Sequence, residues 1–234
     1  ADLRGSIGDT GHHEGNWALA SRQLTDADRI LGIWGSYDLR ESETGNHFDQ
    51  VAFGIEVLSY EKDFRLNGYV PTNLDPKLVP GGAATAAIRN GNLVVNSNQE
   101  LAYWGLDGEF GRLLWSNDPG LVEQGDAEDK WYTGLDAELR GFVGGYYFDN
   151  PTAGFDQIAG PRVRAELRMY DLTLLGDGSR LTLEALIQDD GVRGTQAEAG
   201  LYVRIPLGPR PGRRLDRMQR RMVELNAEWR RRGI

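Results

Sequence analysis

The chain has 234 residues, of which 40% are hydrophobic, and it carries a formal net charge of −9 with no cysteine. No run approaches the roughly 20 apolar residues that a membrane-spanning helix needs, which excludes a helical membrane protein. The lack of cysteine excludes a disulfide scaffold and a thiolate metal site. A membrane barrel is not excluded, because its alternating strands need only about 9 to 11 residues each.

The first two thirds of the chain contain seven segments with the features of strands. In residues 48–59, Val51, Phe53, Ile55 and Val57 share one face and Glu56 lies on the other. Period-two alternation of this kind predicts a sheet with one apolar and one polar face. The seven expected strands cover residues 1–7, 16–24, 29–40, 48–59, 64–70, 99–114 and 135–143.

Residues 71–98 have a different composition. They contain Pro71, Pro76, Pro80 and the pair Gly81-Gly82, followed by a run of small residues. Such clusters of Pro and Gly predict a long loop. Two questions stay open for this loop: whether it packs inside or over a barrel or is simply exposed, and whether residues 84–96 add a pair of strands.

Three further strands are expected at residues 161–171, 179–188 and 197–207, where alternation is strict, so ten strands can be counted. Alternation does not say whether the apolar face points into a soluble core or outward to lipid. The outward arrangement is favoured, because Gly and Ala at many apolar-face positions would fill a soluble core poorly. The polar faces then line a lumen, and the candidate lumen residues are Arg162, Arg164, Glu166, Arg168, Glu184 and Arg204.

Aromatic residues near the expected strand ends support the same interpretation, because membrane barrels carry aromatic girdles at both interfaces. The residues expected in these girdles are Trp34, Tyr37, Tyr60, Tyr69, Trp104, Trp115, Trp131, Tyr146 and Tyr147.

The last 26 residues differ from the rest in charge and in periodicity. Residues 209–234 contain nine Arg and three acidic residues, a net of +6, whereas the preceding 208 residues carry a net of −15. We therefore expect a β-domain at 1–208 and a basic linker or helix at 209–234. Apolar residues recur there at intervals of three and four, which predicts an amphipathic helix over 213–232.

This basic helix could be attracted into or near the acidic barrel, or it could be a solvated terminal helix with one docking stripe. Its apolar stripe is Leu215, Met218, Met222, Leu225 and Trp229. Its candidate pore or linker residues are Arg217, Arg220, Arg221 and Glu224.

The sequence contains no pattern typical of an enzyme or of a cofactor site. No Ser/His/Asp constellation, phosphate-binding Gly-rich loop or zinc signature occurs. His12-His13-Glu14 is the one metal-like cluster, and a solvated turn is preferred because adjacent strand residues point to opposite faces. The Arg-rich tail has no interleaved aromatic residues beyond Trp229, so nucleic acid is not expected as a partner.

Several segments, in their order, resemble the β-domain of the intimin/invasin family (inverse autotransporters). The likeness covers most of residues 1–72 and 134–224, and the clearest segments are Gly15–Leu24, Ile30–Asp38 and Asn67-Gly68-Tyr69-Val70-Pro71. Later segments that match are Ile158–Glu166, Gly178–Leu183, Asp189–Gln196, Leu201–Gly208 and Arg220–Glu224.

This resemblance implies an all-β fold, an antiparallel transmembrane β-barrel of about 10–12 strands followed by the short amphipathic helix. It implies a bacterial outer-membrane anchor that translocates and displays a C-terminal passenger of the adhesin or invasin type. The implied partners are outer-membrane lipid, the barrel-insertion machinery, periplasmic chaperones and a passenger domain in cis. The alternative is a stand-alone porin-like or soluble β-barrel that binds a small ligand or a protein partner.

Overall fold

The protein is described by a computed structural model that covers residues 2–7, 13–25, 29–42, 45–79, 85–89, 92–96, 99–117, 136–152, 155–172, 174–175 and 179–205. All regular structure in these ranges is β-strand. Within these described ranges, no helix has the length and apolarity needed to cross a membrane. The expected linker or helix at 209–234, with Arg217, Arg220, Arg221 and Glu224, lies outside the described residues.

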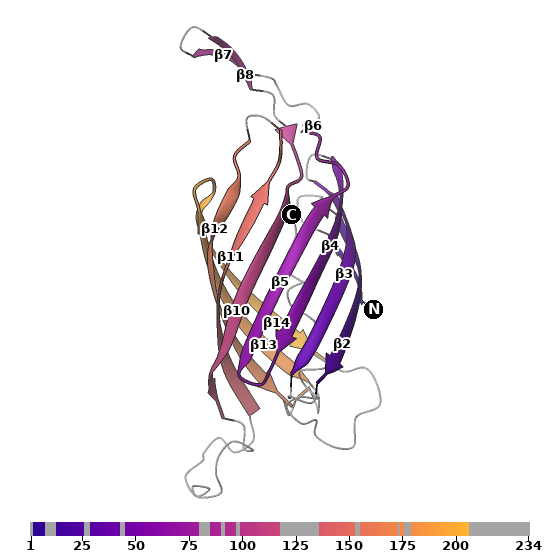
Figure 1. Ribbon diagram of the computed structural model, residues 1–234, viewed down its shortest axis with the longest axis vertical. Coiled ribbons are helices and arrows are strands. Elements are labelled where there is room, and N and C mark those ends of the chain that lie inside the picture. Colours follow the sequence, from indigo (N-terminus) through magenta and orange to yellow (C-terminus); the bar gives the residue numbers. More distant parts are fainter. Residues whose placement is uncertain are drawn as a thin grey trace, which may run out of the picture.

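Ten strands form one large antiparallel sheet in the order β1-β2-β3-β4-β5-β10-β11-β12-β13-β14. Figure 1 shows that this sheet curves round, so that β13 and β14 lie behind β5 and β10. The strands are β1 (Asp2–Ile7), β2 (His13–Leu24), β3 (Ile30–Glu41), β4 (His47–Leu58), β5 (Lys62–Pro71), β10 (Trp104–Ser116), β11 (Asp136–Asp149), β12 (Ile158–Tyr170), β13 (Arg180–Asp190) and β14 (Gly194–Arg204). Each of the ten segments expected to be a strand corresponds to one of these strands.

The expected closed barrel is not formed within the described residues. β1 and β14 are the two edges of the sheet, and no pairing joins them in the described part of the chain. The expectation of ten to twelve antiparallel strands is therefore confirmed for ten strands in one sheet, whereas closure is not formed among the described residues. Closure needs hydrogen bonds between the first and last strands, which the alternation of side chains within a strand does not report.

The segment expected to be a long loop contains two short hairpins between β5 and β10. β6 (Lys77–Leu78) pairs with β9 (Gln99–Glu100), and β7 (Thr85–Arg89) pairs with β8 (Asn92–Asn96). The additional pair of strands that the sequence left open at 84–96 is thus present. In Figure 1 the β7–β8 hairpin lies beyond the upper end of the large sheet, so these strands are not inside it.

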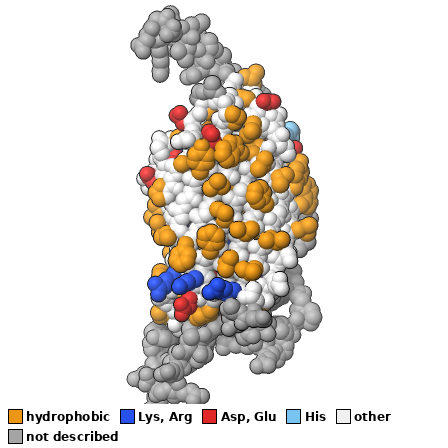
Figure 2. All heavy atoms as spheres, in the orientation of Figure 1, with side chains coloured by type: hydrophobic (Ala, Val, Ile, Leu, Met, Phe, Trp, Pro, Cys, Tyr) orange, Lys and Arg blue, Asp and Glu red, His pale blue; other side chains and the backbone are white. Residues whose placement is uncertain are grey.

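The two faces of the curved sheet have the opposite polarity to a soluble protein. On β4, the outward side chains of Val51, Phe53 and Ile55 are 44–54% exposed, whereas the inward Glu56 is only 4% exposed. The same alternation repeats on β5, β12 and β13, with aliphatic and aromatic side chains outside and charged ones inside. Figure 2 shows the resulting outer surface, on which hydrophobic side chains are spread between the two ends.

The interior also holds a few aromatic side chains, which corrects part of the expected girdles. Trp34, Tyr69 and Tyr146 are buried, so these three do not belong to an outer girdle, whereas Tyr37, Trp104 and Trp115 are exposed as expected. Tyr60 and Tyr147 are half-buried, and Trp131 lies outside the described residues. Trp34 lies across Gly54 on the neighbouring strand, where a Cβ atom would come within 2.3 Å of its ring nitrogen.

Candidate functional site: a charged interior

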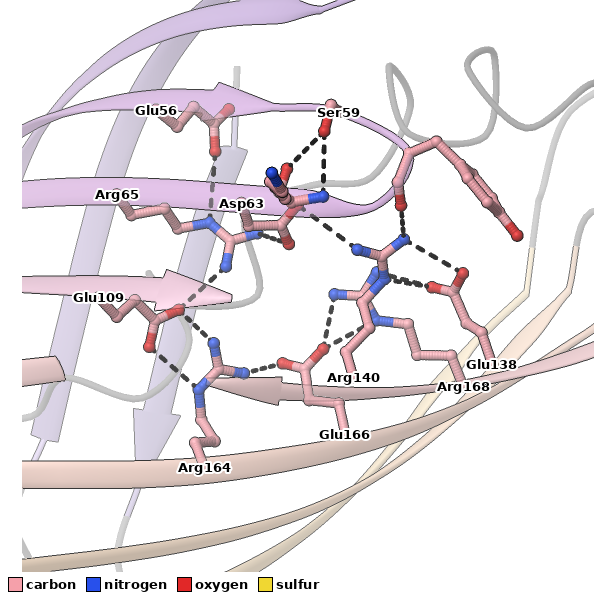
Figure 3. Close-up of polar contacts among 12 residues, drawn as sticks. Glu56, Ser59, Asp63, Arg65, Glu109, Glu138, Arg140, Arg164, Glu166 and Arg168 are labelled. Atoms are coloured by element: carbon pink, nitrogen blue, oxygen red, sulfur yellow. Dashed lines mark hydrogen bonds and ion pairs between the residues drawn. The ribbon is translucent and has the colours of Figure 1, made fainter. Parts of the chain in front are cut away.

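The most distinctive feature of the interior is a set of eight charged side chains on four neighbouring strands, which we call the charge ring. Its members are Asp63 and Arg65 on β5, Glu109 on β10, Glu138 and Arg140 on β11, and Arg164, Glu166 and Arg168 on β12. All eight are less than 9% exposed. Figure 3 shows that they point toward one another across the interior.

Strand register brings unlike charges opposite each other in this set. The Cα partner of Arg65 is Glu109, that of Glu138 is Arg168, and that of Arg140 is Glu166. Directly opposed residues have Cβ atoms about 4.5–5.5 Å apart, close enough for their side chains to pair. The charge ring is therefore a consequence of the register together with the inward position of every second residue.

The first half of the ring runs from β5 to β12. Arg65 Nη1 lies 3.0 Å from Glu109 Oε1, and Glu109 accepts hydrogen bonds from the guanidinium of Arg164. Arg164 in turn donates to Glu166. Arg164 thus bridges two carboxylates, a geometry that its planar, multi-donor guanidinium favours.

The second half returns from β12 to β5. Arg168 lies 2.6 Å from Glu166 and 3.1 Å from Glu138, and Arg140 Nε lies 2.8 Å from Glu138 Oε1. Arg140 Nη1 then approaches Asp63 Oδ1 at 3.5 Å. The circuit closes where Asp63 Oδ2 lies 3.6 Å from Arg65 Nη2. Arg and carboxylate alternate all the way round, so each charge has two neighbours of opposite sign.

An aromatic ring lies against the charge ring on its interior side. The Cζ atom of Arg164 lies 3.8 Å from the centroid of Phe142, and that of Arg65 lies 5.6 Å from it. Phe142 is 2% exposed, and its Cα partner on β10 is Gly111. A Cβ atom at Gly111 would lie 2.4 Å from the Phe142 ring, so the glycine leaves the space in which the ring sits.

Further ion pairs extend the network toward strands on both sides. Arg22 on β2 pairs with Glu56 on β4, which is also 3.7 Å from Arg65. On the other side, Glu184 on β13 lies 3.5 Å from Arg164. The polar network therefore links strands from β2 to β13 along the inner face of the sheet, in the half that lies toward the β4–β5 turn, at the lower end in Figure 1.

Burying so many charges is tolerable only because they are paired. Desolvation of an ion costs several kcal/mol, and this cost is offset when unlike partners and hydrogen bonds surround it. The ring contains four Arg and four carboxylates, so its own net charge is zero. Chemically, such a cluster has no unpaired nucleophile or base to offer, and its arrangement suits closing a polar interior.

Above the ring, the interior opens into a cavity of about 810 Å³. Tyrosine hydroxyls and amides contribute to its wall: Tyr69 donates to Asp107 at 2.8 Å, and Gln188 donates to Gln196 at 2.7 Å. Arg162 also faces this cavity and lies 3.1 Å from Asp107. Burial, and then the carboxylates of Asp156 and Asp149, raise the pKa of the Tyr103 hydroxyl at the cavity mouth, so this phenol stays protonated at neutral pH.

The candidate lumen residues take different positions. Arg164, Glu166 and Arg168 lie in the charge ring, Glu184 contacts it, and Arg162 lines the cavity above it. Arg204 is half-buried on the edge strand β14 and is not part of the ring. His12 of the metal-like cluster lies outside the described residues, and no group of His, Asp or Glu elsewhere in the described ranges is arranged to hold a metal ion.

Five ring members were not singled out from the sequence: Asp63, Arg65, Glu109, Glu138 and Arg140. Arg65, Glu138 and Arg140 stand on the polar side of an alternating segment, a signal that could have found them. Glu109 had no such signal, because glycines at 105, 108 and 111 interrupt the pattern of its strand.

No protein-family model, curated protein or solved structure matches the chain.

Proposed function

We propose that the chain is a bacterial outer-membrane β-barrel that anchors, translocates and displays a passenger on its C-terminal side. The observation that carries the membrane assignment is the inverted polarity of the sheet. Leu19, Ile33 and Val163 are 57–70% exposed on the outside, while Arg140 and Glu166 are at most 2% exposed inside. Transmembrane barrels have this distribution, with an outward apolar band and a polar interior.

In water, this outer surface would be unfavourable. Soluble monomers rarely expose contiguous apolar patches larger than a few hundred Å², and larger ones mark contact with a partner or a membrane. In lipid, the same side chains are solvated by hydrocarbon. Aromatic pairs on the outward face, Trp17 with Tyr37 and Trp104 with Tyr147, would then lie at an interface, where amphipathic rings are favoured.

Closure of the barrel is part of this proposal. Unsatisfied backbone groups at a sheet edge are costly in hydrocarbon, so a sheet that spans a bilayer has to lose its edges. The ten strands are antiparallel throughout, and therefore β1 and β14 run in opposite directions. They can pair with each other, or through an even number of further antiparallel strands between them, without any change of topology.

The charged interior bears on how such a barrel would work. The charged side chains on strands from β2 to β13 are paired along the inner face of the sheet and largely buried, a packing that weighs against the alternative of a wide porin-like pore. An extended chain passing through the interior would need the charge ring to open, or would have to pass before the ring is complete. Display of a passenger therefore implies that the ring assembles late, or separates during export.

Heat-modifiable mobility on SDS gels tests the proposal. The chain is expressed with a signal peptide, outer membranes are isolated, and samples are compared before and after boiling. We expect a membrane-fraction band whose position shifts on boiling, because a closed barrel resists SDS until it is heated. A band in the soluble fraction without a shift would reverse the assignment of the two faces and would favour the soluble alternative.

The display function needs a second readout. An epitope tag is placed after residue 234 and its access to antibody is measured on intact cells. We expect labelling of intact cells for the tagged barrel. Labelling only after the cells are permeabilised would leave an anchored barrel that does not translocate.

A further inference from the structure

We propose that Lys62 and Arg112 form a binding site for the phosphate of an anionic glycerophospholipid on the outer surface of the sheet. This inference rests on the proposed membrane location and adds a specific lipid contact to it. The two residues are Cα partners on the neighbouring strands β5 and β10, and both side chains are exposed. Within the described part of the chain, neither side chain forms an ion pair.

The pair contrasts with the rest of these two strands. Three residues along, the inward pair Arg65 and Glu109 places unlike charges opposite each other. Lys62 and Arg112 instead place two like charges directly opposite, which destabilises an antiparallel pair. A phosphate between the two cations would remove this repulsion, since it accepts hydrogen bonds from both and supplies the missing negative charge.

The surroundings are those of a lipid headgroup. Phe64 and Phe110 follow two residues further along the same strands and are 44% and 46% exposed on the same outward face. Leu114 and Trp115 are also exposed at this end of β10. In Figure 2, Lys and Arg side chains gather near the lower end of the outer surface, below most of the hydrophobic ones and beside one acidic side chain. Cations at the boundary of an apolar band lie at the depth of lipid phosphates.

The backbone around Lys62 is held in place by the β4–β5 turn. Its N–H donates to Ser59 Oγ at 3.0 Å, and Ser59 Oγ donates to the Lys62 carbonyl at 3.0 Å. The N–H of Leu113 on β10 donates to the Glu61 carbonyl at 2.7 Å, which ties the turn to the strand that carries Arg112. Only the two side chains have to become ordered when a phosphate binds.

The end of the sheet on which Lys62 and Arg112 lie indicates which leaflet of the membrane they face, and therefore which type of lipid they meet. The longest connection between strands of the large sheet, residues 72–103, joins β5 to β10 at the opposite, upper end, and the next longest, residues 117–135, joins β10 to β11 at the lower end. Transmembrane barrels keep their short turns on the periplasmic side and their long loops outside. With the longest connection placed outside, Lys62 and Arg112 face the periplasmic leaflet, whose anionic lipids are glycerophospholipids.

Native mass spectrometry of the purified protein in detergent tests this site, with phosphatidylglycerol, phosphatidylcholine or inorganic phosphate added separately. The variant is Lys62→Gln/Arg112→Gln. Its control is Arg29→Gln/Lys77→Gln, which removes one exposed and one half-buried cation that are not strand partners of each other. We expect wild type and control to prefer phosphatidylglycerol, and the variant to bind it at least about tenfold more weakly, since each basic residue contributes about 1 kcal/mol near an anionic surface.

Three outcomes would overturn the site: a wild type without preference for phosphatidylglycerol, an unaffected double variant, or equal binding of inorganic phosphate alone. Heat-modifiable mobility is recorded on the same samples. If the wild type shifts on boiling but has no lipid preference, only the lipid site fails. If the wild type shows no shift, the proposed membrane function fails and the lipid site fails with it.

Discussion

The two halves of the interior are built from the same strands but are filled differently. In the lower half, Arg and carboxylate side chains alternate in a closed ring around Phe142. In the upper half, tyrosine, glutamine and Arg162 surround a cavity of about 810 Å³. In the charged half every member has two neighbours of opposite charge, whereas the contacts of the upper half include neutral partners, such as Tyr69 with Asp107 and Gln188 with Gln196. How the polar interior is packed thus depends on which partners the register provides as well as on polarity.

The largest change is expected when the ring is opened without a change in its net charge. In the variant Arg164→Ser/Glu109→Ser, one cation and its carboxylate are lost, while Arg65 keeps Asp63 and Glu166 keeps Arg168. We expect discrete conductance steps in planar lipid bilayers for this variant and no steady channel for the wild type.

The matched control for this experiment is Gln188→Ser/Gln196→Ser in the upper half. These two amides also bond to each other, at 2.7 Å, but they line the cavity and leave the ring intact. We expect the control, like the wild type, to show no steady channel conductance. Equal conductance of wild type and ring variant would mean that the lumen is not closed by the ring.

Removing a single ring member should cost stability instead. Arg140 is fully buried, donates to Glu138 and to the carbonyl of Tyr60, and pairs with Asp63. Arg140→Leu leaves two buried carboxylates short of a cation, so we expect a loss of about 3–5 kcal/mol in the free energy of unfolding. The loss is measured from the urea dependence of the heat-modifiable band.

Arg29→Leu serves as the comparison for Arg140→Leu, because Arg29 is exposed and lies outside the network. A surface substitution of this kind should change the free energy of unfolding by no more than about 0.5 kcal/mol. Similar losses in the two variants would show that the ring contributes nothing beyond ordinary surface charges.

Much of this architecture is predictable from the sequence, because alternation within a strand is a local property. Residues such as Val51, Glu56, Leu183 and Glu184 fall on the expected faces from their order alone. Which face is buried is not local: it depends on the curvature of the whole sheet. The partners of Arg140 are equally non-local, since Asp63 is brought to it only by the order β5-β10-β11.

Glu109 and the sheet edges show where prediction from the sequence stops. The glycines around Glu109 weaken the alternation of β10, yet one of them, Gly111, is needed for Phe142 to fit against the ring. The open edges at β1 and β14 leave no mark in the hydrophobic pattern either, because an unpaired strand alternates in the same way as a paired one.

The packing of Phe142 offers a smaller test of the lower half. Gly111→Ala places a Cβ 2.4 Å from the Phe142 ring and should cost about 1–3 kcal/mol, as overpacking usually does. Gly108→Ala on the same strand places its Cβ no closer than 3.4 Å to any neighbour and should cost less. If both alanines have the same effect on urea unfolding, the close approach of Gly111 and Phe142 is not what positions the ring.

The smallest effect is expected when one neutral donor is removed from a carboxylate of the upper half that keeps other donors. Tyr146 is buried and donates to Asp190 Oδ2 at 2.8 Å, whereas the hydroxyl of its neighbour Tyr147 lies 3.4 Å from Asp149 Oδ2. Tyr146→Phe should lower the free energy of unfolding by about 1 kcal/mol, because Asp190 keeps Arg193 and the N–H of Val192 as donors. Tyr147→Phe should have almost no effect. A loss for Tyr146→Phe as large as that for Arg140→Leu would contradict the comparison, since it would mean that the upper half is also held by a cooperative network.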